Sequence, residues 1–278
     1  MEFKYFSKNG EVLRIEQAAM PLSNIEYQYG FGVYESVRRA NGIVYFLKDH
    51  LERLMESARI IGLEHSFSSQ SIDSYISELV LKNGAGTCNI KILLVGGRTV
   101  ADASLFILCL NPLFPDKKLY RDGVALITYP YERAFPHAKT LNMLESFLAY
   151  RRAQARGAYD ALLISGRGYV TEGTRTNFFC IGGRTIFTPR ESDILPGVTR
   201  KVVLQVAGAA GFAVEEKDIR PRDLPLYDGA FITSTSSKIL PVHAIDDHAY
   251  GAAPAPLREL MGAFDRLLAS YRGAVKGG

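Results

Sequence analysis

A stretch rich in prolines and charges, "NPLFPDKKLYRD" at residues 111–122, separates two halves of the chain whose apolar patterns differ. Such a stretch between apolar segments is typical of a link between domains. The chain has 278 residues, 47% of them hydrophobic, which is enough for one large core or two smaller ones. We therefore expect residues 1–115 to form an N-terminal domain, 116–124 a linker, and 125–278 a C-terminal domain.

In the N-terminal half, strand patterns alternate with helix patterns. Asn9 and Gly10 form a turn signal between two short apolar runs, which predicts a β-hairpin. Apolar residues recur at helical spacing in "KDHLERLMESARIIGL", residues 48–63, and Gly62 stands where that helix would end. The other elements expected in this half are strands at 41–47, 89–95 and 104–110 and a helix at 71–84.

In the C-terminal half, "HAKTLNMLES" indicates an amphipathic helix that begins near Lys139, with a strand on either side of it. Pro196 and Gly197 precede a further helix, and the chain closes with an amphipathic helix. We expect a two-lobed α/β or α+β protein. The remaining strands are expected at 123–131, at 160–166, and around a bend and a tight Gly-Gly hairpin within 169–190. A last strand within 229–237 is expected to run into a hydroxyl-rich loop.

Charge and composition exclude several classes of partner. The formal net charge is +4, and no run of consecutive Lys or Arg forms a basic block, so we expect no binding to nucleic acid. The first residues lack the build of a signal peptide, and no apolar run approaches the roughly 20 residues of a membrane span. Cys88, Cys109 and Cys180 are odd in number and widely scattered, which predicts buried reduced thiols. We therefore expect a cytoplasmic protein with no metal site and no membrane contact.

Two charged residues in the C-terminal half have both an ordinary and a chemical explanation. Lys139 is a solvated residue at a helix start, or an amine that attacks carbonyl groups once it has lost its proton. Glu172, directly before Gly173, is a turn residue, or a carboxylate that keeps a pyridine nitrogen protonated. Neither residue decides the question alone.

Three further stretches are suited to binding an anion. In "LPGVTR", Gly197 allows close approach of the backbone, and the N–H groups of Val198 and Thr199 lie at a helix start. Thr235, in the hydroxyl-rich "TSTSS", offers a hydrogen bond to the same phosphate, and Arg53 offers a guanidinium fork. A plain helix start, a polar loop and a surface arginine are the ordinary alternatives. We assign His50, on the same helix as Arg53, a structural role.

Together these stretches resemble the class IV aminotransferases, the fold-type IV family that depends on pyridoxal 5′-phosphate (PLP). The family includes branched-chain aminotransferases, D-amino-acid aminotransferases and aminodeoxychorismate lyase. The matching stretches run in the family's order from about residue 29 to residue 242. They are "YGFGVYESVR", "HLERLMESA", "KTLN", "GYVTEGTRTNFF", "TPRESDILPGVTR" and "FITSTSSKILPV".

The resemblance implies a role for each matching residue. Lys139 would form the Schiff base with PLP and move a proton between substrate Cα and cofactor C4′. Glu172 would pair with the pyridine nitrogen. The resemblance also implies a small α/β N-terminal lobe and a larger C-terminal lobe with a barrel-like sheet. It further implies a homodimer or larger homo-oligomer that acts on amino acids and 2-oxo acids. The phosphate would be held by Arg53, the backbone at Val198 and Thr199, and Thr235.

The substrate site departs from each subgroup's pattern. Tyr34 would face the substrate, and Arg38, four residues later, matches an arginine of the branched-chain enzymes. Arg98 lies where D-amino-acid aminotransferases carry an arginine and a histidine, but "VGGRTVADASLF" contains no histidine. Met143 replaces the tyrosine of the branched-chain enzymes, so another group, with Arg133 as the candidate, would contact the phenolic oxygen of PLP. Arg38, Arg98 and Arg175 are the candidates for binding the substrate carboxylate.

Several activities remain open within this resemblance. The leading expectation is a ping-pong aminotransferase that acts on branched-chain or other hydrophobic amino acids, with 2-oxoglutarate as acceptor. A D-amino-acid or (R)-amine transaminase is a variant of it. The lysine segment resembles that of aminodeoxychorismate lyase about as well. A non-catalytic descendant would have lost the lysine, whereas Lys139 is present.

Overall fold

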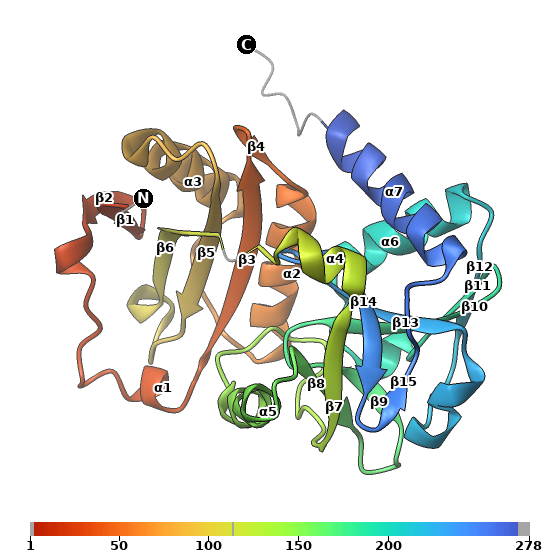
Figure 1. Ribbon diagram of the computed structural model, residues 1–278. Coiled ribbons are helices and arrows are strands. Elements are labelled where there is room, and N and C mark those ends of the chain that lie inside the picture. The colour runs from red at the N-terminus through yellow and green to blue at the C-terminus, as the bar shows by residue number, and fades with distance from the viewer. Residues whose placement is uncertain (1–2, 113, 272–278) are drawn as a thin grey trace. The chain divides into compact units, whose positions relative to one another are not determined.

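The computed structural model describes residues 3–112 and 114–271, which form two compact units (Figure 1). The first unit contains residues 3–112 and 138–143. The second contains Phe114–His137 and Leu144–Tyr271. Within the described residues, no helix has both the length and the apolar character needed to cross a membrane.

The first unit is built on a six-stranded sheet in the order β2-β1-β6-β5-β3-β4. Its strands are β1 (Tyr5–Lys8), β2 (Glu11–Arg14), β3 (Gly32–Ala40), β4 (Ile43–Val44), β5 (Cys88–Val95) and β6 (Ser104–Leu110). The predicted hairpin of β1 and β2 is confirmed: Asn9 and Gly10 at its turn have φ angles of 53° and 95°, as the tightest hairpin turns require. The predicted strand at 41–47 is wrong beyond Val44, because Phe46 takes a φ of 53° and the chain turns there into a helix.

Two helices cover one face of this sheet. They are α2 (Leu47–Ile60) and α3 (Ser69–Asn83), and both were predicted (Figure 1). Gly62 and Gly84 follow them with positive φ angles, as expected of residues that end helices. Alternate residues of β3, β5 and β6 meet the apolar faces of α2 and α3 in one core, in which Cys88 and Cys109 are buried and reduced as predicted. A single helical turn, α1 (Ile25–Gln28), precedes β3.

The segment around Lys139 belongs to the first unit and is not helical. The expected helix begins only at Leu144, so its predicted start near Lys139 is wrong. The reason is a competing set of backbone bonds with β3: Tyr34 N–H donates to the Lys139 carbonyl at 2.9 Å, and Leu141 N–H donates to the Gly32 carbonyl at 2.8 Å. An extended segment can pair with a strand in this way, whereas a helical one cannot.

The second unit contains a barrel-like sheet. Six strands pair in the order β10-β13-β14-β7-β8-β9, and the pairing of Glu172 with Asn177 joins β9 back to β10. The predicted α/β class with a barrel-like sheet is thus confirmed. These strands are β7 (Val124–Pro130), β8 (Asp160–Ile164), β9 (Val170–Gly173), β10 (Asn177–Gly182), β13 (Gly229–Ser234) and β14 (Lys238–Ile245). Three more strands extend the sheet: β11 (Thr185–Thr188), β12 (Ala213–Glu216) and β15 (His248–Ala249).

Alternate residues of the barrel strands form one apolar cluster, which includes the buried and reduced Cys180. Ala149 and Ala153 of a helix pack against Ala161 and Leu163 of β8 in a second cluster. Phe179 and Phe231, paired across β10 and β13, stack with ring centroids 4.7 Å apart. The helices of this unit are α4 (Lys117–Asp122), α5 (Leu144–Ala155), α6 (Val198–Ala209) and α7 (Ala255–Ser270).

Candidate active site

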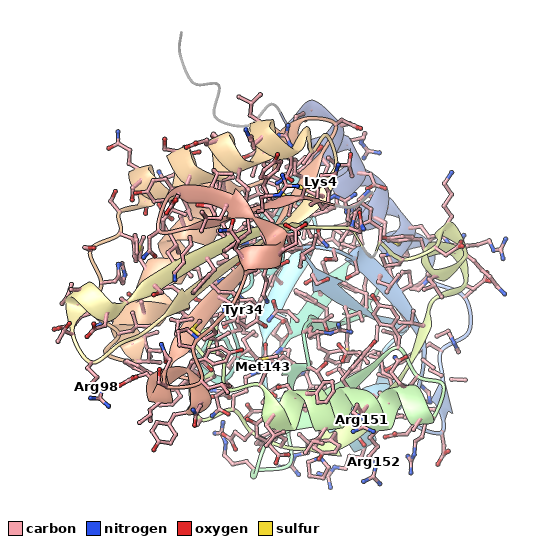
Figure 2. The ribbon with its side chains drawn as sticks, turned by 90° about the vertical axis from the view of Figure 1, so that its left-hand side faces the viewer. Lys4, Tyr34, Arg98, Met143, Arg151 and Arg152 are labelled. Carbon is pink, nitrogen blue, oxygen red and sulfur yellow. The ribbon has the colours of Figure 1, made fainter. Side chains whose placement is uncertain are left out.

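In the first unit, Lys139 and Tyr34 lie together. The Lys139 ammonium is 4.6 Å from the centroid of the Tyr34 ring, and the Lys139 backbone N–H donates to Ser57 Oγ at 3.0 Å. The Tyr34 hydroxyl is 3.7 Å from the sulfur of Met143, and Figure 2 shows these two residues close to each other. The pairing with β3 therefore fixes the lysine backbone and leaves its side chain against an aromatic ring.

A second lysine, which the sequence analysis missed, shares this ring. Lys91 Nζ lies 3.5 Å from the Tyr34 centroid, because Lys91 sits on β5 opposite Ser36, one diagonal step from Tyr34 on the same sheet face. Burial lowers the pKa of Lys91 from 10.5 to about 8, and the nearby charge of Lys139 acts in the same direction. The available signal was a lysine in the middle of the apolar run "NIKILLV".

Arg53 lies on the opposite face of β3 from Tyr34, in a buried ionic cluster with Glu35 and His50. Its Nε donates to Glu35 Oε1 at 2.7 Å and its Nη2 to Oε2 at 3.0 Å, while His50 Nδ1 is 2.8 Å from Oε2. Burial acts to raise the pKa of Glu35, but Arg53 and His50 outweigh it and hold this pKa well below its usual range. The two-point contact fixes the plane of the guanidinium.

The other two arginines of the first unit differ in placement. Arg38 lies on β3 four residues after Tyr34, so its side chain starts from the same sheet face. Arg98 follows β5, is 75% exposed, and approaches Glu26 at 3.5 Å. Figure 2 shows Arg98 well away from Tyr34 and Met143. The structure thus brings Lys139, Tyr34 and the base of Arg38 to one face of the first unit, but not Arg98.

In the second unit, a buried carboxylate shapes the turn that carries Glu172. Asp160 accepts hydrogen bonds from the hydroxyls of Thr174 and Thr176 and from the backbone N–H of Ala161. A Cβ on Gly173 would lie 2.1 Å from Thr176 Oγ1, so the turn closes this tightly only around a glycine. Arg175, at the tip, is exposed and stacks on Tyr150 at 4.0 Å.

Glu172 is almost fully buried and hydrogen-bonded by three groups of the second unit. Arg133 Nε donates to its Oε1 at 2.7 Å. The backbone N–H of Leu195 donates to its Oε2 at 3.2 Å, and the amide of Asn177 lies 3.5 Å from the same oxygen. The contact with Leu195 joins the carboxylate to the "LPGVTR" stretch, 23 residues further along the chain. Arg133, which we expected to contact the phenolic oxygen of PLP, thus donates to the Glu172 carboxylate.

The "LPGVTR" stretch leads into α6, as predicted, with Gly197 as the residue before the helix. Among the described residues, no side chain caps the first N–H groups of α6. Arg200, in its first turn, is buried and contacts Glu191 and Glu216, which ties the preceding loop to β12. In β13, which contacts α6, the buried hydroxyl of Thr233 lacks a hydrogen-bond partner among the described residues. Thr235 follows this strand directly. Uncapped N–H groups and hydroxyls suit an anion.

Gly197→Ala is expected to disturb the contact between Asn177 and the loop that precedes α6. A Cβ at this position would lie 1.9 Å from Asn177 Oδ1, so Asn177 would have to leave the Leu195 carbonyl, to which it donates at 2.9 Å. We expect a loss of about 1–3 kcal/mol in the free energy of unfolding, measured by urea denaturation. Gly208→Ala, in the same helix, is the matched control, because a Cβ there meets nothing within 4 Å. Equal stability of the two variants would contradict the prediction.

Comparison with known proteins points to one family. The family model described as "Amino-transferase class IV" matches residues 32–245. A D-alanine aminotransferase of Bacillus licheniformis is 34% identical over 259 residues, which cover 90% of this chain and 91% of that protein. A putative branched-chain-amino-acid aminotransferase of Methanocaldococcus jannaschii is 31% identical over 252 residues, 86% of each chain. The solved branched-chain amino acid aminotransferase of "T.th." with pyridoxamine 5′-phosphate has a TM-score of 0.89 at 26% identity, and the match covers 98% of this chain and 96% of that one.

Proposed function

Because this chain belongs to the class IV aminotransferase family, we propose that it moves the amino group of branched-chain or other hydrophobic amino acids to 2-oxo acids such as 2-oxoglutarate. The family consists of PLP enzymes, and this chain is a PLP-dependent transaminase. Its reaction is ping-pong: a first amino acid leaves as a 2-oxo acid, and a second 2-oxo acid then receives the amino group.

The residues present fit the cofactor. The N–H groups of α6 and the Thr233 hydroxyl, which lack side-chain partners within the described part of the chain, are donors for a phosphate. Glu172 is an acceptor for a protonated ring nitrogen. When bound, PLP supplies an electron sink for the charge that develops at substrate Cα. Our assignment of the phosphate to Arg53, the backbone at Val198 and Thr199, and Thr235 remains a proposal.

Lys139 carries the proton chemistry in this proposal. Its amine would tether the cofactor aldehyde in the resting enzyme and, once released by the incoming amino group, move a proton between substrate Cα and cofactor C4′. The contact with the Tyr34 ring supports this role, because it holds the end of the Lys139 side chain on the sheet face from which Tyr34 projects. Glu172 would keep the ring nitrogen protonated.

Tyr34 also has apolar neighbours, beside the two lysines at its ring, and these neighbours carry the proposed preference for hydrophobic amino acids. On β5, Leu93 lies directly opposite Tyr34. The sulfur of Met143 contacts the Tyr34 hydroxyl. Leu93 and Leu141 pack against one apolar cluster of the first unit. Tyr34 and Arg38 would then face the substrate, with Arg38 at its carboxylate. For Arg98 to bind that carboxylate, it would have to leave Glu26.

A preference for D-amino acids is the second candidate, favoured by the 34% identity to a D-alanine aminotransferase. A half-reaction screen separates the two. The purified holoenzyme receives L- or D-amino acids one at a time without a 2-oxo acid, and the long-wavelength absorption of bound PLP is followed. We expect L-leucine to bleach this band and D-alanine to leave it. Bleaching by D-alanine alone would overturn the proposed substrate class.

We further propose a homodimer or larger homo-oligomer that works in the cytoplasm. Large apolar side chains are exposed in each unit, among them Leu22 and Tyr29 in the first and Leu144 and Phe147 in the second. Such residues are typical of surfaces that associate. The three buried, unpaired cysteines fit a reducing compartment. Sedimentation at micromolar concentration tests the assembly, and a monomer there would contradict it.

A further inference from the structure

Glu172, the carboxylate proposed to contact the ring nitrogen of PLP, forms an ion pair with Arg133 within the second unit. Arg133 holds Glu172 at 2.7 Å, with the two side chains 18% and 4% exposed. The other nitrogens of the guanidinium donate to Ser146 Oγ at 3.0 Å and to the Thr174 carbonyl at 2.8 Å. Arg133 is therefore fixed by the start of α5 and by the turn after β9, and its distance to Glu172 is set by the fold.

Glu172 keeps the acceptor capacity for one more hydrogen bond. Among the described residues, three groups donate to it: Arg133 at Oε1, and the Leu195 N–H and the Asn177 amide at Oε2. A carboxylate offers about four lone-pair sites. The protein donors therefore leave a site for a protonated pyridine nitrogen, and the guanidinium need not move when the cofactor binds.

We propose that Arg133 is a positioning residue that acts through Glu172, placing its positive charge against the carboxylate so that the shared proton stays on the ring nitrogen of PLP. This inference rests on the proposed function, because it takes Glu172 as the partner of that nitrogen. A proton shared by a pyridine and a carboxylate stays on the nitrogen when a second cation stabilises the carboxylate. A protonated ring is the stronger electron sink.

The test compares PLP with an analogue in which C–H replaces the ring nitrogen. The dissociation constant of each is measured by titrating the apoenzyme and following its tyrosine fluorescence. The wild type should bind PLP more tightly than the analogue. Arg133→Gln should reduce this ratio at least about tenfold, the effect of one charge-assisted hydrogen bond. Ser146→Ala, which removes a different contact of Arg133, is the matched control and should keep the wild-type ratio.

Two further variants separate the possible failures. Arg133→Lys keeps the positive charge, should keep most of the ratio, and provides a result if Arg133→Gln does not fold. The inference would be overturned if Arg133→Gln weakened the binding of PLP and of the analogue equally, or if Arg133→Lys lost the difference in affinity between them. Arg133 would then only stabilise the structure of the loop. Glu172→Gln tests the premise: if it leaves the ratio unchanged, Glu172 is not at the ring nitrogen. If it abolishes the ratio while Arg133→Gln does not, only the inference about Arg133 fails.

Discussion

Lys139→Ala is expected to lower the transamination rate about 10⁴-fold or more while the protein remains folded. The variant loses the amine that would tether PLP and transfer the proton at Cα. It keeps the backbone contacts of residue 139 with Tyr34 and Ser57, because these involve only its N–H and carbonyl groups. Steady-state rates with L-leucine and 2-oxoglutarate measure the loss, and thermal unfolding verifies the fold.

A matched lysine and a chemical rescue make this prediction specific. Lys48→Ala removes an exposed lysine of α2 and should leave the rate unchanged. A small primary amine added to Lys139→Ala should restore part of the rate, because it supplies the missing base. A Lys139→Ala rate close to that of the wild type would show that the proton transfer belongs to another residue.

The second large effect is expected from Glu35→Gln, which should destabilise the fold by about 3–5 kcal/mol. The substitution keeps the shape of the side chain but removes the negative charge that contacts Arg53 and His50 in a largely buried site. The free energy of unfolding in urea measures the loss. Glu56→Gln is the control, because it removes only an exposed ion pair with Arg59 on α2, the helix that also carries Arg53. Its free energy of unfolding should be close to that of the wild type.

The effect of Glu35→Gln should depend on pH in a defined direction. The pKa of Glu35 is held below its usual value of 4.5 in the fold, so its contribution is fully present above about pH 4.5. That contribution is lost as the pH falls toward the lowered pKa, because the unfolded chain then binds more protons than the folded one. The stability difference between wild type and variant should therefore shrink as the pH falls below about 4.5. A constant difference would exclude Glu35 as an ionised buried group.

Local patterns in the sequence predicted most of the elements, because their signals lie within a few residues. Gly62 follows α2, and Asn9 and Gly10 turn the hairpin, all three with positive φ angles that these residue types favour. Pro196 and Gly197 precede α6, as is common at helix starts. The predicted helix start near Lys139 was wrong because the signal that decides this conformation is not local. The bonds that hold this segment extended come from β3, about a hundred residues away, and no local pattern records them.

The same distinction applies to the candidate site. The sequence indicated which residues would carry the proposed chemistry, but not the groups that hold them. Glu35 clamps Arg53, Arg133 pairs with Glu172, and Lys91 shares the Tyr34 ring, and each contact joins separate strands, helices or loops. A lysine within an apolar strand or a carboxylate next to a predicted site residue is a signal of such partners, although its partner is known only from the fold.

The covalent attachment of PLP to Lys139 is the central claim, and borohydride tests it directly. Reduction of the holoenzyme with borohydride makes the link between lysine and cofactor permanent, and digestion followed by mass spectrometry identifies the modified peptide. The account predicts one phosphopyridoxyl group, on the peptide that contains Lys139, and none in Lys139→Ala. Modification of the Lys91 peptide instead, or of no peptide at all, would contradict it.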